Sequence, residues 1–350
     1  MRDYRPLPIC VITQLEVDGS PAPQTNRHFQ LSRKLPSRDL IARDLIAREV
    51  VVVKPLVCVV GPTASGKSAL ALSLAVELNG EIVSCDSMQL FRECDIVTAK
   101  PPREDRESVP HHLLDLLNPD EQPSAAGWAA RADEAIRDVE SRGKMPIVCG
   151  GTGFYLRALL QPQTLAASPP NAKLRAQLES ELQLVGATKM HDRLAEQNPG
   201  AAARLHPNDS HRVIRALEVE LSPPIENGPS LAAREAQVFC LDWPREALVS
   251  RINARIAAMI DAGALDETRA LIERWGENAP ALGGVGYKQL RAHLRGEHPW
   301  PSAVELWQTA TRQYAKRQGT WFRGQTNALW LDARKPPEEL MAEVIKHEGT

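Results

Sequence analysis

From Leu56 onward, short apolar runs alternate with stretches that have helical spacing. Ser68–Leu78 and Trp128–Ser141 carry their apolar residues at the intervals of amphipathic helices. Such alternation predicts parallel β-α-β units in which helices cover a sheet, and so an α/β fold. The predicted strands are Leu56–Val60, Glu81–Cys85, Pro146–Cys149, Gln237–Leu241 and Ala328–Leu331.

One long segment interrupts this alternation. Between about Pro162 and Glu235 the sequence is helix-like and has no apolar run typical of a strand. Its helix-breaking stretches are the prolines Pro169 and Pro170 and the loop Ser222–Pro229. We therefore expect a helical insertion domain at 162–235, set into a catalytic core made of residues 55–161 and 236–350.

The first part of the chain differs from the rest. Residues 1–54 are proline-rich and polar, and they include a tandem repeat, Arg38–Ala42 followed by Arg43–Ala47. The repeat suits one short helix at most. We expect 1–54 to be a disordered N-terminal extension, too rich in acidic residues for a transit peptide.

Composition sets broad limits on the class of protein. Hydrophobic residues make up 43% and charged residues 25%, the mixture of an ordinary globular protein, with a net charge of −2. No apolar run approaches the roughly 18 residues of a membrane span, and no secretory signal is evident. The six cysteines form no C-x-x-C pair, so we expect no zinc site, no disulfides and a cytoplasmic location. With no evident long-period repeat or coiled coil, we expect a monomer.

Positive charge gathers in one region although the total is balanced. A local basic face of this kind can bind phosphates, and a solvated helix surface is the alternative that charge alone leaves open. The only acidic residues between Tyr287 and Arg323 are Glu297 and Glu305. The basic residues are Lys288, Arg291, Arg295, Arg312, Lys316, Arg317 and Arg323.

The strongest motif follows the first predicted strand and precedes a predicted helix. It fits G-x-x-x-x-G-K-[ST], a P-loop whose backbone N–H groups cradle phosphate oxygens. Lys67 adds a positive charge, and the Ser68 hydroxyl is placed to hold Mg²⁺. The core is therefore expected to be a P-loop-type parallel sheet flanked by helices. The predicted diphosphate- or nucleotide-binding residues are Gly61, Pro62, Thr63, Ala64, Ser65, Gly66, Lys67 and Ser68.

Asp86 ends the second predicted strand, where strand ends face the ligand crevice of such sheets. A carboxylate there could be a general base, a partner of Mg²⁺ or a helix N-cap. The P-loop itself does not choose among a kinase, a GTPase-like switch and an enzyme with a pyrophosphate leaving group. The sequence blocks that follow the P-loop are needed to distinguish these three classes.

Several further blocks follow the P-loop along the chain. They are Asp86–Phe91, Asp95–Pro101, Pro110–Asp115, Gly150–Leu160, Ala201–Asp209, Arg212–Glu218, Val285–Gln289 and Thr311–Gln318. In this order they resemble the tRNA dimethylallyltransferases, and ordered blocks of this kind are far more specific than one P-loop. The resemblance covers about Leu56 to Trp330, nearly all of the chain after the extension.

The resemblance implies a definite reaction. The dimethylallyl group of dimethylallyl diphosphate would pass to N6 of the adenosine at position 37 of tRNA, 3′ to the anticodon. The products would be N6-isopentenyladenosine and diphosphate, with Mg²⁺ as the cofactor. Asp86 matches the base that takes the N6 proton, and Arg255 matches the arginine that contacts the diphosphate. Thr63 would contact the leaving group, and Arg251, four residues before Arg255 on one helix face, could reach it too.

The resemblance also implies where the anticodon stem-loop of tRNA binds. The adenine must leave its stack to reach a buried site, which predicts a channel open at both ends. Tyr314, Trp321 and Phe322 are expected to pack inward because aromatic residues at helical spacing usually do. The implied tRNA-binding residues are Asp86, Ser87, Met88, Gln89, Thr98, Lys100, Thr152, His211, Arg212, Val213, Ile214, Arg215, Gly284, Val285, Gly286, Tyr287, Lys288 and Gln289.

The chain departs from the family pattern at a few positions. Glu93 and Val97 stand where the family usually has glycine, so a backbone with positive φ there would be strained. Phe91 replaces a common tyrosine. The rival interpretations are a small-molecule or nucleotide kinase, a prenyltransferase of free adenine nucleotides, and an RNA-binding protein with a relic P-loop.

Overall fold

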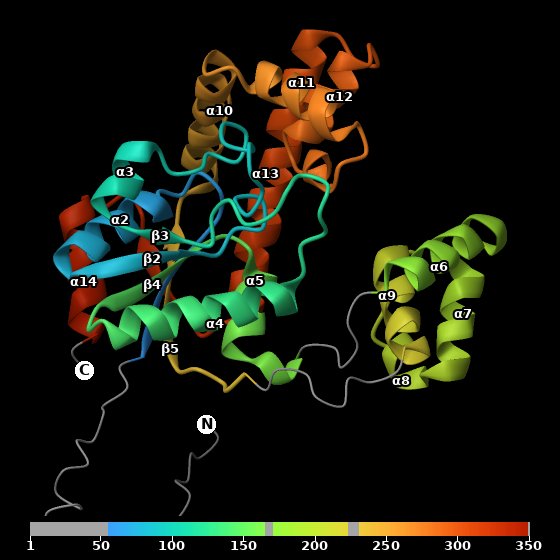
Figure 1. Ribbon diagram of the computed structural model, residues 1–350, viewed down its shortest axis with the longest axis horizontal. Coiled ribbons are helices and arrows are strands. Elements are labelled where there is room, and N and C mark those ends of the chain that lie inside the picture. The colour runs from blue at the N-terminus through green and yellow to red at the C-terminus, as the bar shows by residue number, and fades with distance from the viewer. Residues whose placement is uncertain (1–54, 165–170, 223–230, 349–350) are drawn as a thin grey trace, which may run out of the picture. The chain divides into compact units, whose positions relative to one another are not determined.

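The computed structural model describes residues 55–164, 171–222 and 231–348 (Figure 1). The predicted extension at 1–54 lies outside the described residues. Six strands of the described chain form one parallel sheet in the order β3-β2-β4-β1-β5-β6. They are β1 (Leu56–Val60), β2 (Gly80–Ser84), β3 (His111–His112), β4 (Met145–Gly150), β5 (Ala236–Asp242) and β6 (Leu329–Asp332).

This sheet confirms the predicted α/β fold. All five predicted strands form, and their ends move by no more than one residue. β3 was not predicted, because His111 and His112 form no apolar run. It nevertheless extends the sheet by pairing with Ile82 and Val83 of β2.

Helices cover both faces of the sheet, and β1 shows how. Its five residues are buried and alternate between two clusters, as successive side chains of a strand do. Cys58 and its same-face neighbours pack with α4 (Ala125–Ser141) and α5 (Gly153–Leu160). Val57 and Val59 pack with α2 (Lys67–Glu77) and α14 (Pro337–Glu348). The predicted helix Ser68–Leu78 corresponds to α2, and Trp128–Ser141 falls within α4.

A third cluster joins the C-terminal helices to the loop after β2. Phe91, Cys94 and Val97 from the loop are buried among Ile256, Tyr287 and their neighbours. The long α13 packs on α10, α12 and α5, so it runs from this cluster to the sheet (Figure 1). These elements are α10 (Arg245–Asp261), α11 (Ala264–Trp275), α12 (Tyr287–Leu294) and α13 (Trp300–Gln325). The short helix α3 (Arg103–Ser108) lies between β2 and β3.

Residues 171–222 form a small helical unit with its own core. Its helices are α6 (Ala172–Val185), α7 (Ala187–Gln197), α8 (Pro199–Ala202) and α9 (Ser210–Leu221). Leu178, Met190 and Leu217 are buried at its centre. Glu218 is also buried and accepts hydrogen bonds from Arg175. This α6–α9 unit agrees with the prediction of a helical insertion, and the predicted limits of the insertion, 162–235, stay a prediction.

Two further observations concern the whole described chain. None of its helices combines the length and the apolar character needed to cross a bilayer. The five cysteines in these residues are buried and unpaired, which is how a small apolar side chain packs.

Candidate active site

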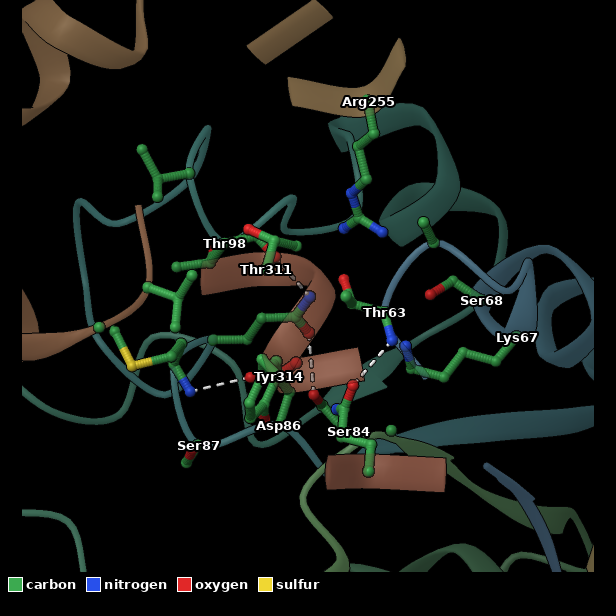
Figure 2. Close-up of a pocket in the computed structure, with 18 of the residues that line it drawn as sticks. Thr63, Lys67, Ser68, Ser84, Asp86, Ser87, Thr98, Arg255, Thr311 and Tyr314 are labelled. Atoms are coloured by element: carbon green, nitrogen blue, oxygen red, sulfur yellow. Dashed lines mark hydrogen bonds between the residues drawn. The ribbon is translucent and has the colours of Figure 1, made fainter. Parts of the chain in front are cut away.

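A cavity of about 360 Å³ opens at the carboxyl ends of β1, β2 and β4 (Figure 2). Ligands of parallel sheets bind at this edge. The P-loop after β1, the loop after β2, α10 and α13 all contribute to its wall. The predicted site residues that line it are Thr63, Ala64, Lys67, Ser68, Asp86, Ser87, Met88, Gln89, Thr98, Arg255, Gly284 and Val285.

The P-loop is held in shape by three side chains from distant parts of the chain. Gln318 Oε1 accepts a hydrogen bond from the Thr63 N–H at 2.8 Å. Arg251 Nε donates to the Ala64 carbonyl, and Trp243 Nε1 donates to the Ser65 carbonyl, both at 2.8 Å. The loop is therefore fixed before a ligand enters.

Two cations face the cavity from the P-loop and α10. Burial and the nearby Arg255 lower the pKa of Lys67, whose Nζ donates only to the Pro62 carbonyl at 3.4 Å among the described residues. Burial also lowers the pKa of Arg255, with Asp86 acting in the opposite direction. Neither cation forms an ion pair with any described residue. Two largely buried cations that lack an ion-pair partner in the described chain and lie beside a P-loop favour a polyanion such as diphosphate.

Arg251 does not line the main cavity that Arg255 lines, and the expectation that both reach one diphosphate stays a prediction. Its guanidinium stacks over the Trp243 ring at 4.5 Å and bonds to the loop. It lines a second hollow of about 320 Å³ that shares Ala64, Lys67, Ser68 and Arg255 with the main cavity. Two hollows thus meet at the phosphate-binding groups, and the two-ended channel stays a prediction.

Asp86 lies across the cavity from Arg255 (Figure 2). One carboxylate oxygen accepts a hydrogen bond from the Met88 N–H at 2.9 Å. A turn follows Asp86 instead of a helix, so the helix N-cap interpretation fails. No described side chain hydrogen-bonds to the carboxylate, which leaves its other oxygen able to accept a proton from a ligand.

The loop after β2 uses its polar groups largely on itself. The Ser87 N–H donates to Thr152 Oγ1 at 3.0 Å. Gln89 accepts from Ser84 Oγ at 3.0 Å and donates to the Thr98 carbonyl at 3.4 Å. Both ends of the Gln89 amide thus form hydrogen bonds within the protein, while Gln89, an implied tRNA-binding residue, also lines the cavity.

Several predicted tRNA contacts are placed elsewhere. The Lys100 ammonium is buried, and it bonds to Asp95 at 2.5 Å, to Asp115 at 2.6 Å and to the Phe91 carbonyl at 2.9 Å. Its side chain is 1% exposed. Lys100 therefore stabilises the loop after β2, and its ammonium is not available to a ligand in this structure.

Other predicted contacts divide between surface and core. Val213 and Ile214 belong to the core of the α6–α9 unit, while His211 and Arg212 are exposed and Arg215 bonds to Glu218 at 2.9 Å. Gly286 and Tyr287 are also buried, so these four buried residues do not present a surface to RNA in this structure. Lys288 is exposed, and Gln289 caps α12 by accepting from the Gly286 N–H at 2.9 Å.

Thr311–Gln318 was one block of the family resemblance, but no residue of α13 was predicted to line the site. Trp307, Thr311, Tyr314 and Gln318 follow one another at intervals of four, three and four residues and all lie on its wall. That spacing is one helix face, and it was the available signal. Tyr314 was expected to pack inward, yet it lines the cavity, and burial raises its pKa. Phe322 is fully buried, as expected.

The two positions where the family carries glycine differ from each other. Glu93 has a φ of 63°, in the left-handed region, which costs about 1 kcal/mol for a residue with a side chain. Val97 has no such backbone and places its side chain on the cavity wall. Only the first replacement is strained.

Comparison with known proteins gives one consistent family. The family model described as IPP transferase matches residues 89–325. A tRNA dimethylallyltransferase of Anaeromyxobacter dehalogenans is 47% identical over 297 residues, which are 83% of this chain and 99% of that protein. One from Symbiobacterium thermophilum is 43% identical over 288 residues, covering 81% and 90%.

Solved structures agree with the sequence relatives. The crystal structure of a full-length tRNA isopentenylpyrophosphate transferase from Bacillus halodurans is similar, with a TM-score of 0.63 and 35% identity, covering 84% of this chain and 96% of that one. A eukaryotic dimethylallyltransferase acting on tRNA gives a TM-score of 0.66 and 28% identity, covering 80% and 74%.

Proposed function

This chain belongs to the tRNA dimethylallyltransferase family, and we propose that dimethylallyl diphosphate is its donor and N6 of adenosine 37 its acceptor. It transfers a dimethylallyl group to an adenosine of tRNA. The observation that carries the assignment of roles is the opposition of Arg255 and Lys67 to Asp86 across one cavity. A diphosphate fits the cationic side, and a nucleophile that must lose a proton fits the other.

The leaving group would lie against the P-loop. As the allylic C–O bond breaks, negative charge grows on the diphosphate, and Lys67, Arg255 and backbone N–H groups stabilise it. Thr63 lies at the same wall, where its hydroxyl can bond to a phosphate oxygen. Removing one such donor typically costs about 10²–10³-fold in rate.

The acceptor would enter from the side of Asp86. As N6 attacks the allylic carbon, an N–C bond forms, and the N6 proton passes to the free carboxylate oxygen. Tyr314 and Met88 line the same wall and can border a flipped base. The anticodon stem-loop would present this adenosine, with exposed groups such as His211 and Arg212 meeting its backbone.

Mg²⁺ fits the donor side. No group of three His, Cys, Asp or Glu side chains able to hold a metal occurs among the described residues. Mg²⁺ does not need one, since it commonly binds through one or two protein oxygens together with substrate phosphates and waters. The Ser68 hydroxyl is exposed at the cavity and would hold it, and the ion would neutralise diphosphate charge.

The active unit is proposed to be a cytoplasmic monomer. The buried free thiols of the described residues suit a reducing compartment. Size-exclusion chromatography with light scattering would give the mass of one chain. A dimer that retains activity only when intact would overturn the monomer.

The decisive experiment follows the label of radiolabelled dimethylallyl diphosphate. Purified protein is incubated with Mg²⁺ and unmodified tRNA that has an adenosine 3′ to its anticodon. Label should enter tRNA, fail to do so with Asp86→Ala, and persist with Asp120→Ala, which alters an exposed carboxylate.

Parallel reactions separate the rivals. AMP replaces tRNA in one, and ATP with small acceptors replaces both substrates in another. Label in AMP alone would indicate a prenyltransferase of free nucleotides, and phosphate transfer without prenyl transfer would indicate a kinase. Binding of tRNA without any transfer would leave an RNA-binding protein.

A further inference from the structure

One short turn in the loop after β2 forms part of the cavity wall. The Ala99 N–H donates to the Ile96 carbonyl at 3.0 Å, and the Lys100 N–H donates to the Asp95 carbonyl at 2.9 Å. This is a single helical turn, and it carries Val97 and Thr98 to the cavity. Gln89 holds its carboxyl end by donating to the Ala99 carbonyl at 3.2 Å.

The amino end of the turn is held by a residue far along the chain. A helical turn leaves its first N–H groups without partners in the turn. Glu267 of α11 accepts all three. Its Oε2 bonds to the N–H groups of Asp95 and Ile96 at 2.8 and 2.7 Å, and its Oε1 bonds to that of Val97 at 3.1 Å. The carboxylate acts as an N-cap supplied from another helix.

The local residue that could cap the turn is used elsewhere. The carboxylate of Asp95 lies at the start of the turn, but its Oδ1 bonds to the buried Lys100 ammonium at 2.5 Å. The capping carboxylate observed at these N–H groups is therefore that of Glu267. Hydrogen bonds to a charged acceptor contribute more than neutral ones, so the attachment is strong.

Glu267 also joins this turn to a second wall of the cavity. The Tyr287 hydroxyl donates to Glu267 Oε1 at 2.6 Å. Tyr287 begins α12, directly after the segment of Gly284 and Val285 that lines the cavity. The two walls are packed tightly, because a side chain at Gly286 would approach Val97 Cγ1 to 2.5 Å.

We propose that Glu267 is a positioning residue that fixes the acceptor side of the cavity by capping the turn Ile96–Ala99. This inference rests on the proposed function, in which that side receives the tRNA adenosine. Glu267 does not line the cavity. Its effect therefore passes through Val97 and Thr98.

Kinetics with both substrates test the proposal. Glu267→Gln keeps the size of the side chain but places an amide NH₂ among N–H donors. We expect the KM for tRNA to rise about tenfold, the effect of losing a charge-assisted hydrogen bond, while the KM for dimethylallyl diphosphate is unchanged. Glu273→Gln, an exposed position on the same helix, should match the unsubstituted protein. Tyr287→Phe, which removes only one bond to the carboxylate, should have a smaller effect.

Hydrogen exchange gives a readout independent of activity. Amides of residues 94–100 should exchange faster in Glu267→Gln, and those of β1 and α2 should not change. Equal rises in both KM values, or unchanged exchange in the turn, would overturn the proposal. If the unsubstituted protein does not prenylate tRNA, the proposed function fails, yet the exchange experiment still decides whether Glu267 caps the turn.

Discussion

The side-chain oxygen of Gln318 accepts a hydrogen bond from the backbone N–H of Thr63 at 2.8 Å, across 255 positions of sequence. The same amide donates through Nε2 to the Gly151 carbonyl at 2.9 Å. A side chain at Gly151 would approach Gln318 Nε2 to 2.3 Å, so this contact requires glycine. One amide of α13 thus ties the P-loop to the loop after β4.

Loss of this amide should weaken both stability and donor binding. Gln318→Leu leaves the Thr63 N–H and the Gly151 carbonyl unpaired, and each buried unpaired group costs about 1–3 kcal/mol. We expect a lower urea midpoint and a higher KM for dimethylallyl diphosphate. Gln313→Leu, at an exposed position of α13, should change neither. An unchanged KM in a destabilised Gln318→Leu would separate the two effects and disprove the link to the donor.

Arg255 and Arg251 should differ in function although they lie one helical turn apart. Arg255→Gln removes a cavity cation, and we expect kcat to fall about 10²–10³-fold. Arg251→Gln loosens the Ala64 carbonyl and the Trp243 stack, so its effect should be smaller and mainly on KM for the donor. Arg245→Gln, exposed at the start of α10, is the control. Equal losses for both variants in steady-state assays would contradict this assignment.

Activity should depend on Mg²⁺ through Ser68. Chelation with EDTA should abolish prenyl transfer, and added Mg²⁺ should restore it. Ser68→Ala removes one metal ligand, so half-maximal activity should need several times more Mg²⁺, whereas Ser68→Thr keeps the hydroxyl. Activity measured against Mg²⁺ concentration for Ser68→Ala and Ser68→Thr tests this role. Identical titration curves for the two variants would exclude Ser68 as a ligand.

Glu81 gives a prediction about pH. Its side chain is 1% exposed, and hydrogen bonds, that from Arg142 above all, hold the pKa of the carboxyl far below its usual range. A carboxylate with a depressed folded pKa stabilises the fold above its unfolded pKa of about 4.3, and loses this effect as pH falls toward the folded value. Glu81→Gln should lower the free energy of unfolding by about 3 kcal/mol at neutral pH.

The difference in the free energy of unfolding between the unsubstituted protein and Glu81→Gln should shrink as pH falls below about 4. Urea unfolding from pH 7 to pH 3 measures it, with Glu77→Gln at an exposed site of α2 as the control. A difference that is constant with pH would mean that Glu81 acts by packing alone.

Local patterns predicted the parts of the molecule that local sequence determines. The apolar runs predicted five strands, because parallel strands covered on both faces are mostly apolar, although β2 also contains the buried Glu81. The P-loop was predicted because all of its backbone donors come from consecutive residues. Lys67 and Asp86 were placed correctly at one edge, since the ends of parallel strands share it.

The remaining contacts depend on the fold. Nothing near Lys100 in sequence indicates that its ammonium would be enclosed by Asp95 and Asp115. Likewise, Glu267 is an ordinary helix residue until α11 meets the turn. Val213 and Ile214 are different, because with Leu217 they have the spacing of a buried helix face, and that spacing predicts their burial.

The strand order has a consequence for synthesis on the ribosome. β1 lies between β4 and β5, and the whole insertion is translated after β4 and before β5. Throughout that interval the nascent chain carries an apolar strand with one edge unpaired, a template for pairing with other chains. Truncated chains ending before Ala236 should therefore aggregate, and slow translation of residues 162–235 should increase the need for chaperones.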